Sequence, residues 1–346
     1  MQEIIDFTNS YIVPRKLGGS SKKIRVKYDD KFYILKFAKE KENPYVNDIK
    51  TNFNTAISEY ISSRIFQSVG IDTNNTLLGV YNDELCVACE DFRTVYEENI
   101  EFSEFARTIY DPDEFEKSPE MKQLYEIYEC GAFPHDLKEK AIERFWDMFV
   151  VDALVGNYNR NASNWGVLLN TLTDSYKLAP VYGLGRTLFT FPYLSDEASW
   201  IISNDFEMLK KGFAYPFPSS PNKTDEFLGY YDILSSNCDN NCSKALVRIF
   251  PRIDMNKIFS IVDNTPYLSE ERKGFYKKVL QLRYETILER AYNCCITQNF
   301  DKDAQYRIQN KIFINDTILE KMMANNCFEN VSALPNADKD AEHEMF

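Results

Sequence analysis

The residues with the clearest chemical potential lie in two short stretches near the middle of the chain. The first reads DALVGNYNRNASNWG from Asp152 to Gly166, and the second reads LAPVYGLG from Leu178 to Gly185. The amide oxygen of Asn164 can ligate a hard cation such as Mg²⁺. No acid follows Asp152 in the first stretch and the second contains none, so the two offer few groups that accept a proton or hold a metal tightly.

These stretches resemble the catalytic centre of the HipA-like serine/threonine kinases. That family carries the pattern G-N-x-D-R-H, an asparagine five positions after the aspartate, and then V-Y-D or V-F-D further along. Here Asn159 stands at the first aspartate, Asn161 at the histidine and Gly183 at the second aspartate. Similar flanking motifs extend the resemblance over most of residues 10–295, at 58–60, 77–81, 87–92 and 282–284.

The resemblance implies an α+β, bilobal, protein-kinase-like fold with a small antiparallel-sheet N-lobe and a mainly helical C-lobe. We expect the N-lobe in residues 1–92, the C-lobe in 93–330 and a charged, mobile tail in 331–346. The residue pattern agrees, because 23–28 and 32–37 predict a β-hairpin with Lys36 on one strand face. A second hairpin is predicted around 76–81 and 85–89, with a helix over 55–69 before it.

Further along, a helix with a broad buried face is predicted to end at Gly156, where the loop with the motif begins. Two short strands, 165–169 and 176–181, are expected to bring Asn164 and Gly183 to the same end of a hairpin. The remainder to about residue 291 is helical in character, with one long segment over 270–292.

The resemblance also names residues that hold a nucleotide. Lys36 and Glu59 are similar to the strand lysine and helix glutamate of kinases, whose ion pair directs the lysine to the nucleotide. Small residues that resemble the family's phosphate loop precede the first strand: Gly18, Gly19, Ser20 and Ser21. Asn164 remains as a weak magnesium ligand, so the implied cofactors are ATP with little or no Mg²⁺.

The two catalytic positions have lost their acids. An amide at position 159 cannot take up a proton, which removes a contribution of ~10² to 10⁴ in rate. Gly183 has no side chain with which to bind the metal that neutralises the β and γ phosphates. Lost chemistry with retained architecture predicts a pseudokinase.

Composition limits the alternatives. The chain has 346 residues and a net charge of -13, so the average field repels nucleic acid and we expect no nucleic-acid partner. No apolar run approaches the length of a membrane span, and the N-terminus does not resemble a secretory signal, which predicts a cytoplasmic protein without a membrane partner. The eight cysteines are expected to be reduced thiols rather than zinc ligands.

Three hypotheses remain open. The first is a HipA-like pseudokinase that binds nucleotide, a protein partner or both. The second is an active serine/threonine kinase or nucleotidyl transferase with displaced carboxylates, for which Asp152, Asp174 and Asp205 are conceivable substitutes. The third is a toxin-antitoxin component that neutralises an active relative by pairing with it.

Overall fold

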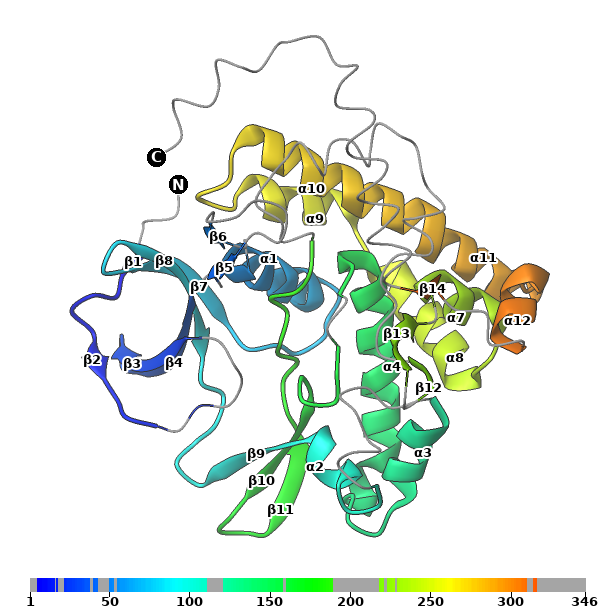
Figure 1. The fold of residues 1–346 in the computed structure, drawn as a ribbon, viewed down its shortest axis with the longest axis horizontal. Helices are drawn as coiled ribbons and strands as arrows, with labels where there is room; N and C mark the ends of the chain where they lie inside the picture. The colour runs from blue at the N-terminus through cyan, green and yellow to red at the C-terminus, as the bar shows by residue number, and fades with distance from the viewer. Residues whose placement is uncertain are drawn as a thin grey trace.

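The computed structural model describes residues 5–15, 17, 22–37, 40–42, 50–52, 55–110, 121–157, 160–188, 218–220, 223–227, 229–309 and 314–315. These residues form an α+β fold, with most strands in the N-terminal third and most helices in the C-terminal half (Figure 1). The predicted fold class is therefore confirmed. The lobe boundary at residue 92 stays a prediction, and the predicted tail lies outside the described residues.

A curled six-stranded sheet forms the N-terminal part, at the left of Figure 1. Its order is β1-β7-β8-β4-β3-β2, and β1 runs parallel to β7 whereas the other neighbours are antiparallel. The strands are β1 (Ile5–Asp6), β2 (Tyr11–Ile12), β3 (Lys23–Tyr28), β4 (Lys31–Phe37), β7 (Thr76–Tyr81) and β8 (Glu84–Glu90). Both predicted hairpins are present, and each turns through two residues of positive φ, Asp29–Asp30 and Asn82–Asp83, as tight hairpins require.

The two faces of this sheet have different roles. The outer face forms a small core of its own, with Phe7, Val26 and Leu35 fully buried. The inner face contacts helix α1 (Thr55–Ser68) and joins the main core. Cys86 belongs to the outer core and Cys89 to the inner one, as the three-residue spacing in a strand predicts.

A second sheet has three strands, β9 (Glu97–Glu101), β10 (Gly166–Asn170) and β11 (Ser175–Leu178), in the order β11-β10-β9. The predicted hairpin is β10–β11, and β9 is an addition that the sequence pattern did not indicate, because its charged residues do not alternate with apolar ones. The short helix α2 (Phe102–Ala106) follows β9 directly.

Helix α4 (Lys138–Val155) runs through the centre of the C-terminal part, and Gly156 ends it in the left-handed conformation as predicted (Figure 1). The predicted helix over 270–292 is continuous but contains a π-helical stretch, Tyr284–Glu289. The other helices are α3 (Met121–Glu129), α7 (Tyr230–Ser236), α8 (Asn240–Ile249), α9 (Met255–Asp263), α10 (Glu270–Arg283), α11 (Arg290–Thr297) and α12 (Lys302–Gln309), with 3₁₀ turns at His135–Leu137 and Phe250–Arg252. Short strands β5 (Glu40–Glu42), β6 (Lys50–Asn52), β12 (Pro218–Ser220), β13 (Lys223–Phe227) and β14 (Ile314–Asn315) complete the described elements.

The described ranges contain neither a membrane-spanning helix nor a cluster of metal-ligating side chains. None of their helices combines the length and apolar character that crossing a bilayer requires. Within the same ranges no group of three or more histidine, cysteine, aspartate or glutamate side chains is placed to hold a metal ion, and the described cysteines are all free thiols.

Candidate functional site

Lys36 and Glu59 form an ion pair between the sheet and α1. The Nζ atom of Lys36 lies 2.5 Å from Oε1 of Glu59, and the glutamate side chain is 6% exposed. Burial by itself lowers the pKa of Lys36, but neighbouring acidic groups outweigh it and hold that pKa above the ordinary value. Because burial raises the pKa of the Cys89 thiol to about 12, this thiol is neutral near pH 7 and Glu59 supplies the countercharge.

Glu59 also lies close to the backbone at Gly185, the last residue of the second motif. A β-carbon added at Gly185 would lie 3.3 Å from Oε2 of Glu59, so the backbone passes close to this carboxylate. The same segment is tied to α1 by the hydroxyl of Thr187, 2.7 Å from that of Ser62. Val181 donates its backbone N–H to Asp72. The ion pair and the second motif thus share one location.

Asn164 and Gly183 face one another at short range. Gly183 has φ +74°, and a β-carbon built on it would lie 2.7 Å from Oδ1 and 2.9 Å from Cβ of Asn164. Real β-carbons do not approach other heavy atoms this closely, so the asparagine side chain occupies the space beside the glycine. Position 183 thus lacks a carboxylate, and its surroundings leave no room for one without movement of Asn164.

Arg160 connects the two segments that carry Asn164 and Gly183. Its side chain is 1% exposed and binds the fully buried carboxylate of Asp152 through Nε at 2.7 Å and Nη2 at 3.0 Å. Its Nη1 atom donates to the carbonyl oxygens of Asn164 at 2.8 Å and Tyr182 at 2.6 Å. One guanidinium therefore sets the spacing of the loop and the second motif.

Hydrogen bonds also fix the beginning of the loop, at Asn157. Asn157 donates its side-chain amide to Asp152 at 2.8 Å, and the hydroxyl of Tyr230 donates to the carbonyl of Asn157 at 2.6 Å. Nε of the fully buried Arg283 donates to the carbonyl of Ala153 at 2.7 Å. These contacts anchor the end of α4, from which the loop departs.

The inner face of the sheet carries two further basic residues that sequence reasoning did not assign to the site. Lys23 lies directly opposite Lys36, and Arg25 lies opposite Ile34. The two-residue turn fixes this register, whereas the sequence analysis placed Lys31 in the turn and so did not find the pairing. Arg25 forms an ion pair with Asp91, with Nε of the arginine 2.9 Å from Oδ2 of the aspartate.

An acidic residue approaches the site from β9. Glu101 lies opposite Gly166, two residues after Asn164. Burial raises the pKa of Tyr182, and the negative charge of Glu101 adds to this rise although Asn99 donates a hydrogen bond to the phenol at 3.2 Å. Sequence periodicity gave no reason to include Glu101, because it comes from a strand that was not predicted.

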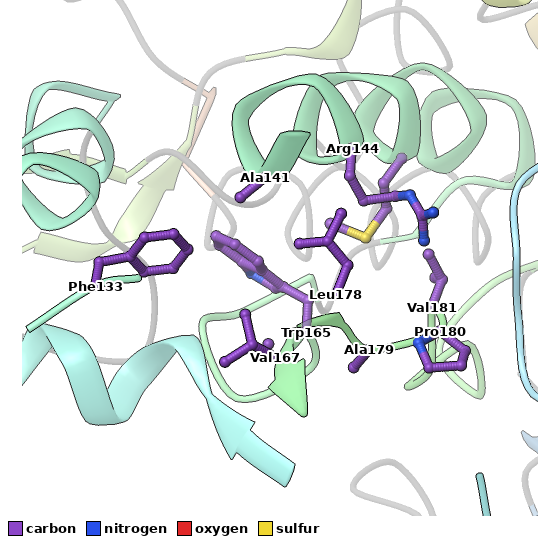
Figure 2. A pocket seen from close by; sticks show the side chains of 11 residues that line it. Phe133, Ala141, Arg144, Trp165, Val167, Leu178, Ala179, Pro180 and Val181 are labelled. Atoms are coloured by element: carbon purple, nitrogen blue, oxygen red, sulfur yellow. The ribbon is translucent and has the colours of Figure 1, made fainter. Parts of the chain in front are cut away.

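A small cavity lies beside these elements, between α4 and the two motif segments (Figure 2). It measures about 20 Å³, and its lining includes Trp165, Leu178, Pro180 and Arg144. The Nη1 atom of Arg144 is buried without a hydrogen-bond partner among the described residues. This volume suits roughly one water molecule, so the cavity is not a nucleotide site.

The structure thus brings four of the predicted site residues to one place: Lys36, Glu59, Asn164 and Gly183. Their roles toward a nucleotide or a metal stay predictions. Asn159 and the predicted phosphate-loop residues Gly18, Gly19, Ser20 and Ser21 lie outside the described residues.

Two of the three conceivable substitute acids are excluded by their positions. Asp152 is fully buried and engaged by Arg160 and Asn157, so it cannot bind a metal without breaking the support of the loop. Asp174 lies in the exposed turn between β10 and β11, at the end of the hairpin opposite to Asn164. Asp205 lies outside the described residues.

Comparisons with known proteins identify relatives of this chain. The family model of the HipA-like C-terminal domain matches residues 15–212. The serine/threonine-protein kinase CtkA of Helicobacter pylori strain J99 is 35% identical over 296 residues, which cover 84% of this chain and 89% of that protein.

One solved structure gives the same result. The crystal structure of the H. pylori proinflammatory kinase CtkA matches with a TM-score of 0.75 and 32% identity, over 86% of this chain and 100% of that chain. A chain of the Shewanella oneidensis MR-1 toxin-antitoxin complex of HipA, HipB and operator DNA matches with a TM-score of 0.47 and 15% identity, over 80% of this chain and 67% of that chain. The chain belongs to the family of HipA-like C-terminal domains and has the kinase fold of CtkA.

Proposed function

We propose that this chain is a pseudokinase, which binds ATP and a protein partner but transfers little or no phosphate. The observation that carries the proposal is the contact between Gly183 and Asn164. Phosphoryl transfer depends on metal ions that bridge the β and γ phosphates and on acidic residues that hold them. At position 183 the acidic side chain is missing, and Asn164 takes the space beside it.

Proton transfer is impaired for a separate reason. The sequence places Asn159 where the family has its catalytic aspartate, and an amide has no useful basicity near pH 7. CtkA is named as a serine/threonine-protein kinase. This chain can have the same activity only if other residues replace the acids missing at positions 159 and 183.

The parts that attract a nucleotide are retained. Lys36 is held by Glu59 at 2.5 Å, and Lys23 lies opposite Lys36 on the neighbouring strand, on the same face of the sheet. A basic surface of this kind attracts a polyphosphate even in a protein of net charge -13, because short-range charges dominate over the average field within a Debye length. Loss of an aspartate at position 183 also removes repulsion between the protein and the phosphates.

The proposal is tested by calorimetric titration of the purified chain with ATP, in EDTA and in Mg²⁺, together with transfer assays from γ- and α-labelled ATP. We expect binding in EDTA that Mg²⁺ does not improve, loss of about tenfold or more in affinity in Lys36→Ala, and no transfer of either label. The matched control is Lys140→Ala, an exposed lysine on α4. Magnesium-dependent transfer that disappears in Lys36→Ala would show an active enzyme instead.

One observation favours such an enzyme as a second candidate. Glu101 lies close enough to Tyr182 for its charge to influence the phenol, so it is a carboxylate near the metal position although it comes from β9. If label transfer is found, Glu101→Gln must abolish it while Glu104→Gln, a neighbouring glutamate in α2, leaves it unchanged. Transfer that survives Glu101→Gln eliminates this residue as the displaced ligand.

The protein partner is the remaining part of the proposal. A kinase fold without phosphoryl transfer acts by binding other proteins at its surface. One candidate partner is an active kinase of the same family, as in a toxin-antitoxin pair. Coexpression and copurification with an active relative tests that pairing. A chain that stays monomeric in the presence of the relative and leaves its activity unchanged contradicts this partner.

A further inference from the structure

Lys23 and Lys36 form a cross-strand pair of like charges. Their Cα atoms are register partners in β3 and β4, and directly opposite residues point to the same face with β-carbons about 5 Å apart. Lys36 is directed toward Glu59 on α1. Lys23 therefore projects from the same inner face of the sheet, next to the residue on which nucleotide binding is proposed to depend.

Burial and like charge make this pair electrostatically unfavourable. Like charges that stand opposite each other in a sheet destabilise it, and burial together with the charge of Lys36 lowers the pKa of Lys23. The carboxylates of Glu59 and Glu101 oppose this effect, but the pKa of Lys23 stays below its ordinary value. A polyanion placed over both lysines removes the repulsion and gains two charge-assisted contacts.

We propose that Lys23 contributes the positive charge that a metal ion supplies to the nucleotide phosphates in active kinases, so that this chain binds ATP without Mg²⁺. The inference rests on the proposed function and names the residue responsible for its metal independence. The ammonium group of Lys23, added to that of the strand lysine Lys36, supplies part of the charge of a dication that Asn164, facing Gly183, is poorly equipped to hold.

The preceding residue provides a matched control. Lys22 projects to the outer face, where its Nζ lies 2.7 Å from Oε2 of Glu84 and 4.3 Å from the centre of the Phe37 ring. Phe37 belongs to the outer core. Lys22→Met and Lys23→Met thus remove the same charge from neighbouring positions, but only Lys23→Met removes it from the inner face.

The experiment is calorimetric titration of the full chain and of Lys22→Met, Lys23→Met and Lys23→Arg with ATP and with adenosine, each in EDTA and in Mg²⁺. In EDTA we expect Lys23→Met to weaken ATP binding by about tenfold or more, Lys22→Met by less than about twofold, and Lys23→Arg to retain most of the affinity. Adenosine, which has no phosphate, should bind all four proteins alike. Thermal unfolding should show that Lys23→Met is folded, because the change removes a repulsion.

The outcomes separate this inference from the proposed function. If the unaltered chain binds ATP in EDTA and Lys23→Met binds it equally well, the role of Lys23 is wrong and the pseudokinase proposal stands. If the unaltered chain binds ATP only with Mg²⁺, the metal independence is wrong, and no binding under either condition removes the nucleotide part of both proposals. A loss of adenosine binding in Lys23→Met would mean that the variant disturbs the site as a whole, which also contradicts a charge role.

Discussion

The guanidinium of Arg160 and the carboxylate of Asp152 form an ion pair in the interior, with side chains at most 1% exposed. This pair, rather than any catalytic acid, determines where the loop lies, because the same guanidinium binds the carbonyls of Asn164 and Tyr182. The site can therefore keep its shape when positions 159 and 183 lose their acids.

Asp152→Asn is expected to destabilise the protein by about 3 to 5 kcal/mol, since it leaves the buried charge of Arg160 without its partner. The measurement is the free energy of unfolding in urea. Asp174→Asn is the matched control, because Asp174 lies in an exposed turn with φ 51°, a conformation that asparagine tolerates. A loss below about 1 kcal/mol for Asp152→Asn contradicts the role given to this pair.

Gly183→Ala is expected to destabilise the protein by about 2 to 5 kcal/mol. The left-handed backbone costs an alanine about 1 to 2 kcal/mol, and the overlap with Asn164 adds an overpacking cost of about 1 to 3 kcal/mol. Gly274→Ala in α10, where an added β-carbon meets no atom within 4 Å, should instead stabilise by about 0.5 to 1 kcal/mol. In a double-mutant cycle, Asn164→Gly should relieve part of the cost of Gly183→Ala, and strictly additive effects would argue against the contact.

Restoring both acids, Asn159→Asp with Gly183→Asp, is expected to make ATP binding respond to Mg²⁺ and to recover some phosphoryl transfer. The gain requires Asn164 to turn away from position 183, because the added side chain begins where Asn164 now lies. Thermal stabilisation by ATP with and without Mg²⁺, and transfer of γ-label, are the measurements. Asn159→Asp alone should stay independent of the metal, and the double variant with Lys36→Ala should be inactive. If the double variant gains no response to Mg²⁺, other parts of the site prevent metal binding.

Asp91 should make stability depend on pH in the acidic range. Burial by itself raises the pKa of Asp91, but Arg93 and Arg15 outweigh it and hold this pKa below its ordinary value. The stabilisation is therefore complete above the unfolded-state pKa near 3.9 and is lost as the pH falls through the lower folded-state pKa. Asp91→Asn should unfold more easily at pH 7 and show a smaller further loss of stability below about pH 4.

Urea unfolding at pH 7, 5 and 3 tests this expectation. Asp136→Asn, a change of an exposed residue in the 3₁₀ turn before α4, is the control and should follow the unaltered chain at each pH. An Asp91→Asn profile parallel to that of the unaltered chain would show that this carboxyl does not titrate with unfolding.

Much of this protein was determined by its sequence. Alternation in β3, the apolar and aromatic composition of β4, β7 and β8, and the helical spacing in α1 and α4 are local signals that need no knowledge of the fold. The relation of Asn164 to Gly183 was also predictable, because a hairpin returns the chain to its starting edge. The resemblance to HipA-like kinases provided Lys36 and Glu59 through motifs that survive the loss of the acids.

Tertiary structure alone decided the rest. The strand β9 and its Glu101 reach the site through pairing with a segment far along the chain, and the long-range contacts that hold such a strand leave no periodic pattern in it. The pairing of Lys23 with Lys36 depends on a register that a single misplaced turn residue shifts. Asn164 occupies the space of the missing aspartate because of how the two segments pack. Arg160 sets the backbone positions of both segments, and no short stretch of residues encodes this arrangement.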